Sequence, residues 1–447
     1  MSDYRRIADR IAQDIADGRL RAGQRLPPQR QFARRHHIAP STAGRVYAEL
    51  VRRGLVVGEV GRGTFVRATP ETPPGRALVE ATGTAAPVNL ELNYPLVPGQ
   101  SELLAPALAP LLRPDALGEA LRPAAATGTA AAREAAADLL AVPGWRPRPE
   151  QLLFTGNTRQ SIAAALASLV RPGGRVGVEE LTYPLVKEIA ARLAIRLVPL
   201  AGDAEGVRPD AVADAHRAGP LSALYLQPAL HNPTTRATGA ARLREVADLM
   251  GRLSLPAVED RVWSFLRPDA VPLAAHAPTL THVVDGLSKR VAPGLSAGFV
   301  VVPPDRVEAV AHAVRSGGWG AGRFALEAAV RWAGDGTVAR LVAAKRADAG
   351  VRQTWTRDLL GAYGARTDPG AYFAWWELPA PWRADTFTAA AAAHGIAVTP
   401  GTAFPVDPHR TPDAVRLGLA SAPPERLTWA LRTLADIVRG TSPEAGT

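Results

Sequence analysis

The chain holds few amines that could act as nucleophiles. Only three of its 52 basic residues are lysines, namely Lys187, Lys289 and Lys345, and all the others are arginines. An amine can form a Schiff base with an aldehyde, whereas the guanidinium of arginine stays protonated and cannot. Lys289 follows a predicted strand at 282–285. We therefore predict that Lys289 is the reactive amine, the alternative being an ordinary surface lysine.

Four further polar side chains accompany predicted strands. Tyr183, Asn232 and Asp260 each follow a strand, and Arg416 lies within one near the C-terminus. Because ligands of open parallel sheets bind at the carboxyl ends of the strands, we expect these groups to converge with Lys289. Taken singly, each has a structural alternative, such as a solvated turn for Asp260, a core position for Tyr183 or an ion pair for Arg416.

Together these residue types match one cofactor, pyridoxal 5′-phosphate. It requires a lysine for its aldehyde, a carboxylate beside its pyridinium nitrogen, an aromatic face for its ring and donors for its phosphate. The segment 155–160 (TGNTRQ) opens a predicted helix whose backbone N–H groups suit a phosphate. We expect further cofactor contacts from that helix start and from both sides of Lys289, that is, from Asn157, Thr158, Arg159, Ser288 and Arg290.

The composition indicates a globular protein of more than one domain. With 447 residues, 47% of them hydrophobic, the chain can form two or three domains with a large core. It has no cysteine, which excludes disulfides and thiolate metal ligands, and we expect no metal site. The first twenty residues are polar and no apolar run reaches about 18 residues, so we expect a cytoplasmic protein without signal peptide or membrane span.

Most of the excess positive charge lies near the N-terminus. Residues 1–68 contain fourteen arginines and six acidic residues, a net charge of +8 out of +10 for the whole chain. Such an accumulation is typical of a nucleic-acid binder, the alternative being a solvated surface in an arginine-rich chain. The hydrophobic patterns predict three helices and a two-stranded wing, at 4–16, 29–35, 41–53, 55–60 and 64–66.

Two further regions follow this segment. Residues 69–88 are rich in Pro, Gly, Thr and Ala and are predicted to form a linker. From Val88 onward strand and helix patterns alternate, as in the strands 176–178 and 223–226 and the helix 240–252. This alternation predicts an α/β fold with a mainly parallel central sheet.

The N-terminal segment resembles the GntR-type DNA-binding domain. The resemblance rests on residues 26–30 (LPPQR), 40–50 (PSTAGRVYAEL) and 61–66 (GRGTFV), while Ala39 departs from the usual serine cap. It implies a winged helix-turn-helix whose third helix enters the major groove of double-stranded DNA. The implied base contacts come from Ser41, Thr42 and Arg45. The implied contacts to phosphates or the minor groove come from Arg30, Arg62 and Thr64. A solvated basic rim is expected from Arg34, Arg35, Arg52 and Arg53.

Residues 89–447 resemble the fold-type-I aminotransferases, with a small subdomain at about 305–447. The resemblance implies that Lys289 forms the Schiff base with the cofactor. It also implies that Asp260 pairs with the pyridinium nitrogen and that Asn232 hydrogen-bonds the 3′ oxygen of the ring.

The same resemblance assigns two more residues and shows two departures. It implies that Tyr183 stacks on the ring and that Arg416 binds an amino-acid carboxylate through its bidentate fork. Trp263 stands where the family commonly has a tyrosine near the 3′ oxygen, and its indole N–H can donate a hydrogen bond to the cofactor but cannot act as an acid or base. Ser296 stands where the family usually has a phosphate-binding arginine.

A winged helix-turn-helix fused to an aminotransferase-like domain is the architecture of the MocR-type subfamily of GntR regulators. The resemblance implies a homodimeric transcription factor that binds operator DNA and senses pyridoxal 5′-phosphate, an amino acid or another small amine. Two alternatives stay open: an active aminotransferase that carries a DNA-binding domain, and a regulator whose cofactor site has degenerated. The departures at Trp263 and Ser296 favour a sensor over an enzyme.

Overall fold

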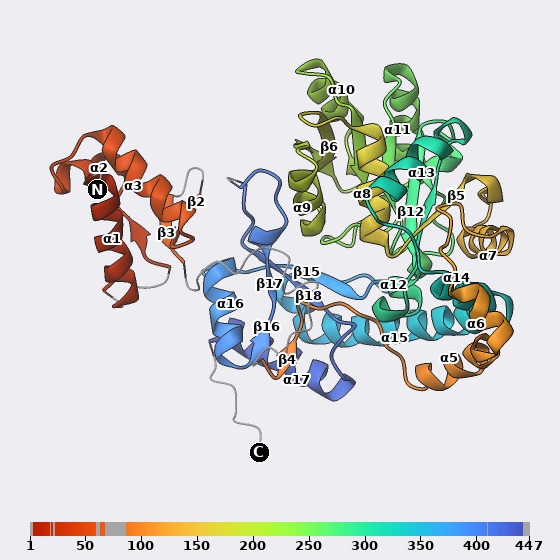
Figure 1. Ribbon diagram of the computed structural model, residues 1–447. Helices are drawn as coiled ribbons and strands as arrows, with labels where there is room; N and C mark the ends of the chain where they lie inside the picture. Colours follow the sequence, from red (N-terminus) through yellow and green to blue (C-terminus); the bar gives the residue numbers. More distant parts are fainter. Residues whose placement is uncertain are drawn as a thin grey trace. The chain divides into compact units, whose positions relative to one another are not determined.

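The computed structural model describes residues 3–17, 19–20, 23–59, 63–67, 86–408 and 410–440 (Figure 1). The chain forms two compact units. The first unit consists of Met1–Leu92, Trp355–Arg366 and Ala374–Thr447. The second unit consists of Asn93–Thr354 and Thr367–Phe373.

The N-terminal part of the first unit is a winged helix-turn-helix. Its helices α1, α2 and α3 pack around a core that contains Phe32, Val46 and Leu50. The helices have the bounds Asp3–Ala16, Gln29–Arg35 and Pro40–Arg52. Pro40 occupies the first turn of α3, where its missing N–H would have no helical partner in any case. The three predicted helices are thereby confirmed.

The wing has one strand more than predicted. β1 (Arg25–Leu26) pairs antiparallel with β3 (Gly63–Val66), which pairs antiparallel with β2 (Val56–Glu59). A run of two residues is too short to show strand alternation, so only the backbone pairing reveals β1. Residues 60–62, which include Arg62, and residues 69–85 of the expected linker lie outside the described residues.

A seven-stranded sheet forms the centre of the second unit. Its order is β5-β13-β12-β11-β10-β6-β7, and the strands from β12 to β7 run parallel. In this order the strands have the bounds Leu152–Thr155, Gly298–Val301, Thr281–Gly286, Ala257–Asp260, Ala223–Leu226, Arg175–Glu179 and Arg196–Leu200. β13 is antiparallel to both of its neighbours, β12 and β5. The predicted α/β fold with a mainly parallel sheet is confirmed.

Helices pack against this sheet and bury its strands. α8 (Thr158–Leu169) packs on β12 and β13, and α13 (Val307–Ser316) packs on α8 and β5. α11 (Ala240–Leu253) shares a core with β10 and β11 that contains Leu224 and Met250. Burial by helices explains why these strands are continuous apolar runs and not alternating ones.

The other helices of the second unit are α5 (Gln100–Leu108), α6 (Pro114–Ala120), α7 (Ala130–Leu140), α9 (Pro184–Arg192), α10 (Pro209–Arg217), α12 (Leu287–Arg290), α14 (Arg323–Gly334) and α15 (Thr337–Leu360), whose last residues belong to the first unit.

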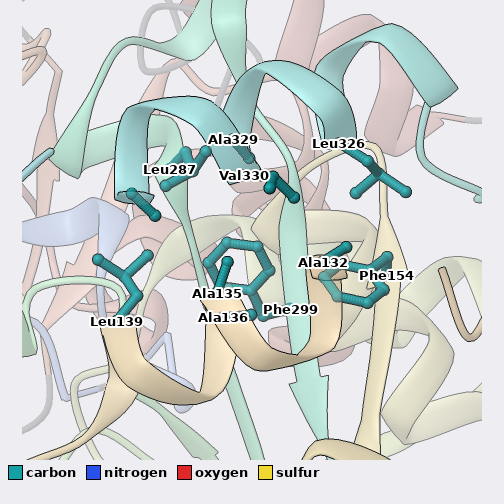
Figure 2. Close-up of a pocket in the computed structure, with 11 residues that line it drawn as sticks. Ala132, Ala135, Ala136, Leu139, Phe154, Leu287, Phe299, Leu326, Ala329 and Val330 are labelled. Carbon is teal, nitrogen blue, oxygen red and sulfur yellow. The ribbon is translucent and has the colours of Figure 1, made fainter. Parts of the chain in front are cut away.

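An apolar pocket lies next to the start of α12, the helix that carries Lys289. Side chains of α7 and α14, mostly alanines, line the pocket together with Leu287 (Figure 2). Apolar packing of Leu287 thus holds the beginning of α12, two residues before Lys289.

The C-terminal part of the first unit contains a four-stranded sheet with the order β14-β15-β18-β17. In this order its strands have the bounds Ala365–Arg366, Phe373–Glu377, Ala414–Gly418 and Thr399–Pro400. The helices α16 (Ala384–Ala393) and α17 (Pro424–Arg439) share a core with this sheet through Phe387, Leu417 and Leu431. No helix in the described ranges is long and apolar enough to span a membrane.

One expectation about this region differs from the structure. The strand that carries Arg416 is not part of the large parallel sheet, because it pairs antiparallel with β17 in the four-stranded sheet. The second compact unit continues past residue 305 to Thr354. The physical reason is packing, since α13 lies on α8 and α14 lies on α7.

Candidate functional site

Lys289 lies in α12, the short helix that follows β12. Its Nζ donates a hydrogen bond of 2.7 Å to the main-chain oxygen of Asn93. The same nitrogen lies 4.1 Å from the centre of the Tyr94 ring and 5.1 Å from that of the Trp263 ring. Aromatic faces attract an ammonium group, so two rings and one carbonyl hold this amine in place. Asn93 and Tyr94 were not predicted, because no motif marks them.

Asp260 is the last residue of β11 and is buried. Its Oδ2 accepts hydrogen bonds from the Tyr225 hydroxyl at 2.6 Å and from Gln227 Nε2 at 2.9 Å. Its Oδ1 accepts a third bond, of 3.0 Å, from the backbone N–H of Val262. Burial raises the pKa of Asp260, while the three donors oppose this shift by stabilising the carboxylate. Such a buried, hydrogen-bonded carboxylate suits a cationic ring nitrogen.

Asn232 lies in the turn after β10 and its Oδ1 is buried without a hydrogen-bond partner. Its backbone N–H donates a bond of 3.3 Å to Gln227 Oε1. The preceding His231 fixes the turn, because its Nε2 donates a hydrogen bond of 2.9 Å to the Leu181 carbonyl and its Nδ1 lies 2.6 Å from the Thr234 hydroxyl. Burial lowers the pKa of His231 to about 4, so this ring is neutral near pH 7. The amide of Asn232 therefore offers a polar atom to a ligand.

The N-terminus of α8 comes very close to β12 and β13. Asn157 caps this helix, since its side chain accepts a 3.1 Å bond from the backbone N–H of Gln160. The hydroxyl of Thr158 is buried without a hydrogen-bond partner. A Cβ at Gly286 would lie 2.6 Å from that hydroxyl, and one at Gly298 would lie 2.5 Å from the Asn157 carbonyl. Only glycine fits at both places, which brings the strand ends against a helix start that suits an anion.

Arg159 and Tyr183 lie near the groups already described. Arg159 is exposed on the first turn of α8. Burial raises the pKa of Tyr94, and the positive charge of Arg159 opposes that shift. Tyr183 precedes α9 and is close enough to Tyr225, the partner of Asp260, to act on its pKa. The structure thus brings both residues toward Lys289 and Asp260.

Two residues beside Lys289 have partners of their own. The hydroxyls of Ser288 and Ser296 lie 2.6 Å apart. Arg290 Nη2 lies 2.5 Å from Asp285 Oδ2, and both side chains are buried. The charge of Arg290 is therefore balanced by Asp285, and its expected contact with a cofactor stays a prediction.

Trp263 is buried within an aromatic cluster. Its ring lies 6.1 Å from Phe265, 6.4 Å from Tyr372 and 5.6 Å from Phe373, centre to centre. Because its neighbours hold the indole beside the Lys289 amine, Trp263 lines the site from one side.

Arg416 belongs to the other compact unit. It is buried in β18. Its Nη2 donates a hydrogen bond of 3.1 Å to the Thr399 hydroxyl and a further hydrogen bond to the Glu91 carbonyl. Its guanidinium carbon lies 5.8 Å from the centre of the Phe404 ring. The structure thus gathers the lysine, aspartate and asparagine in the second unit and gives Arg416 local partners in the first.

The expected DNA-contacting residues lie at the start of α3 and beside it. Ser41 and Arg45 are exposed, and Thr42 is half-buried. A pocket between α2 and α3 is lined by Arg30, Ala33, Arg34, His37, Ile38 and Pro40. Arg34 lies with Arg30 in this pocket and is exposed, so its place in a solvated basic rim stays a prediction. Arg53 is bonded to Asp9 and Glu49, so it connects α1 with the end of α3. Thr64 lies in β3 of the wing.

The residues of the second unit fit pyridoxal 5′-phosphate. Lys289 supplies an amine and Asp260 a carboxylate at the carboxyl ends of the neighbouring strands β12 and β11. The Asn232 amide oxygen and the Thr158 hydroxyl are buried polar atoms without a partner in the described protein, as expected of groups that bind a polar ligand. The carboxylate matches the needs of the ring nitrogen, the side-chain amide those of the 3′ oxygen, and the start of α8 those of the phosphate.

Comparison with known proteins identifies the family. Residues 3–66 match the bacterial regulatory proteins of the gntR family, and residues 88–434 match aminotransferase class I and II. The HTH-type transcriptional regulator YdeF of Bacillus subtilis is 31% identical over 314 residues, 70% of this chain and 67% of that protein. The HTH-type pyridoxine biosynthesis transcriptional regulator PdxR of Corynebacterium glutamicum is 24% identical over 310 residues, 68% of this chain and 67% of that protein.

A solved structure supports the fold of the larger domain. LysN, the α-aminoadipate aminotransferase of Thermus thermophilus, superposes with a TM-score of 0.72 and 21% identity, over 82% of this chain and 96% of that chain. This likeness shows the fold, and the two family matches extend over residues 3–66 and 88–434. The chain therefore belongs to the MocR-type GntR regulators, HTH-type transcriptional regulators in which a winged helix-turn-helix is fused to an aminotransferase class I and II domain.

Proposed function

We propose that this regulator holds pyridoxal 5′-phosphate on Lys289 and senses the cofactor itself, an amino acid or another small amine. The single observation that carries the proposal is the set of Lys289, Asp260 and Asn232 at one edge of the sheet, with two buried polar atoms left for a ligand. The similarity to PdxR, a pyridoxine biosynthesis transcriptional regulator, supports the cofactor as a sensed ligand.

Each residue would contribute a separate interaction. The bound cofactor would supply an aldehyde that captures primary amines. Asp260 would hold the ring nitrogen by a charge-assisted hydrogen bond, and Asn232 would donate to the 3′ oxygen. Tyr183 would cover one ring face, while the start of α8 with Asn157, Thr158 and Arg159 would bind the phosphate. These contacts would hold the cofactor beside the Lys289 amine.

The effector would be an amine with a carboxylate. Arg416 offers a guanidinium fork, whose Nη2 donates to the Glu91 carbonyl and the Thr399 hydroxyl. An effector can change DNA binding only if it binds one conformation better than another. The proposed switch is therefore an exchange of Lys289 for the effector amine, with Arg416 binding the effector carboxylate.

We further propose that the regulator acts as a homodimer. An apolar surface formed by Leu112, Leu117, Leu121 and Phe324 is exposed on neighbouring elements of the second unit, and Leu121 is 80% exposed. Exposed apolar patches of this kind are typical of protein interfaces. A second copy of the chain would bury these side chains and give each operator half-site one winged helix.

An active aminotransferase is the second candidate, because a sensor and an enzyme share the residues that touch the cofactor. Trp263, which has no acid–base chemistry, favours the sensor. The cytoplasmic location expected from the sequence belongs to the same proposal.

The test is DNA affinity with and without cofactor. Binding sites are selected from a random-sequence DNA pool, and the affinity of the full chain is measured with and without pyridoxal 5′-phosphate. The proposal expects the cofactor or an added amino acid to change the affinity of the wild type but not of Lys289→Ala. Equal affinities under all conditions would contradict it, and multiple-turnover release of a keto acid would favour the enzyme.

A further inference from the structure

The second notable lysine of this chain contacts the first. Lys345 lies in α15 and its side chain is fully buried. Its Nζ donates hydrogen bonds of 3.0 Å to the main-chain oxygen of Lys289 and of 2.6 Å to that of Val291. Two of only three lysines in the sequence therefore meet at the same short helix.

The carbonyl groups at this place need donors from outside their own helix. α12 spans only Leu287–Arg290, and Val291 ends it, so its last carbonyls have no helical partner. Lys345 supplies two donors, and Gln100 Nε2 adds a bond of 3.1 Å to the Val291 oxygen. An ammonium group at the carboxyl end of a helix also faces the negative end of the helix dipole.

The choice of lysine at this position is informative in itself. The chain uses arginine almost everywhere that it needs a cation, and arginine has a planar guanidinium with donors in a fixed fork. A compact ammonium with three donors can fit between two carbonyls where that fork cannot. Because burial costs a lysine its hydration, its presence here indicates a specific task.

The surroundings of Lys345 reach the aromatic side of the site. The hydroxyl of Tyr372 donates a hydrogen bond of 2.8 Å to the main-chain oxygen of Lys345, and the centre of its ring lies 6.4 Å from the centre of the Trp263 ring. Direct contacts thus lead from the main chain of Lys289 to Lys345, from Lys345 to Tyr372, and from Tyr372 to the Trp263 ring beside the Lys289 amine.

We propose that Lys345 is the positioning residue of Lys289: it fixes the main chain of α12 so that the Lys289 amine stays between Asn93, Tyr94 and Trp263. The role rests on the proposed function only for what Lys289 does, since the contacts themselves belong to the cofactor-free chain. Without Lys345, α12 would lose both bonds to α15, and the flexible side chain of Lys289 would sample other positions.

Lys345→Met is the direct test, because methionine has nearly the same shape and no donor. Lys187→Met is the matched control, since Lys187 is also partly desolvated but lies on α9. In the cofactor-free protein we expect amide hydrogen exchange in residues 287–292 to become at least about tenfold faster in Lys345→Met, the loss expected for two hydrogen bonds, and to stay unchanged in the control. Unchanged exchange in both variants would overturn the proposal.

A second measurement separates positioning from general damage. The rate at which Lys289 captures pyridoxal 5′-phosphate, trapped with borohydride, should fall at least about tenfold in Lys345→Met. In a Lys289→Ala background the same substitution should leave non-covalent cofactor affinity unchanged, and an equal loss there would overturn the role. In Lys345→Arg, capture of pyridoxal 5′-phosphate by Lys289 should also be slow. A wild-type capture rate in that variant would contradict the need for a compact ammonium. If the wild type captured no cofactor, the proposed function would fail, while hydrogen exchange would still decide the role of Lys345.

Discussion

The hydroxyl of Tyr225 donates a 2.6 Å hydrogen bond to Oδ2 of Asp260, and both side chains are buried. The parallel register of β10 and β11 makes this contact possible, because Tyr225 pairs with Val258, two residues before Asp260. Each strand thus supplies one half of a buried acid–hydroxyl pair. Burial raises the pKa of Asp260, and the Tyr225 bond opposes that shift.

Removing this hydroxyl should weaken cofactor binding. In Tyr225→Phe the carboxylate keeps two of its three donors, so the pKa of Asp260 should rise and its hold on a cationic ring nitrogen should weaken. The loss of one bond to a charged group predicts a cofactor affinity lower by about tenfold or more, measured by equilibrium dialysis. Tyr363→Phe, which removes a hydroxyl bonded to Arg439, is the control. Equal affinities of wild type and Tyr225→Phe would contradict the assignment of Asp260.

The DNA-binding surface predicts two kinds of variant. Arg30→Ala and Arg34→Ala should weaken binding to all sequences alike, because both side chains line the pocket beside α3 and would meet phosphates. Each should reduce the slope of log affinity against log salt by about one. Arg45→Ala should instead relax sequence preference. Arg217→Ala, on α10, is the control, and an unchanged slope in all the variants would exclude the phosphate contacts.

Lys345 should make stability depend on pH. Burial lowers its pKa from 10.5 to about 7 in the folded protein. Between these two values the unfolded chain binds a proton that the folded chain does not, so the free energy of unfolding should rise with pH. In this pH window the free energy of unfolding of the wild type, relative to that of Lys345→Met, should rise by up to about 1.4 kcal/mol per pH unit, measured by urea denaturation. Parallel pH curves for the two proteins would show that Lys345 keeps its ordinary pKa.

The exposed apolar surface predicts a change of oligomeric state. Leu117→Asp and Leu121→Asp place a carboxylate on it, which would lose its hydration in an interface. Both variants should be monomers by light scattering at concentrations at which the wild type is a dimer. Val351→Asp on α15 replaces another exposed apolar residue and should leave the mass unchanged. A dimeric Leu121→Asp variant would place the interface elsewhere.

Local patterns could predict the elements and the placement of Lys289, Asp260 and Asn232. Lys289 and Asn232 follow a strand and Asp260 ends one, and the carboxyl ends of parallel strands lie side by side. The helix α2 was predicted at its observed bounds, and the Pro40 signal found the start of α3. Whether these residues bind the cofactor stays a prediction.

Contacts between distant segments could not be predicted. All four residues of β10 are buried, so no alternation marks Tyr225 as the side chain that faces Asp260. Lys345 gave one signal, its rarity as a lysine, but only the packing of α15 shows that it meets Lys289. The partner strand of Arg416 depends on sheet pairing, which a local apolar run does not reveal.

The central claim is that Lys289 is the amine that holds pyridoxal 5′-phosphate, and covalent trapping tests it most directly. The full chain is incubated with the cofactor and reduced with borohydride, and the modified residue is located by peptide mass mapping. With only three lysines in the sequence, the outcome is unambiguous. We expect one phosphopyridoxyl group, on Lys289. A label on Lys187 or Lys345, or no label at all, would contradict it.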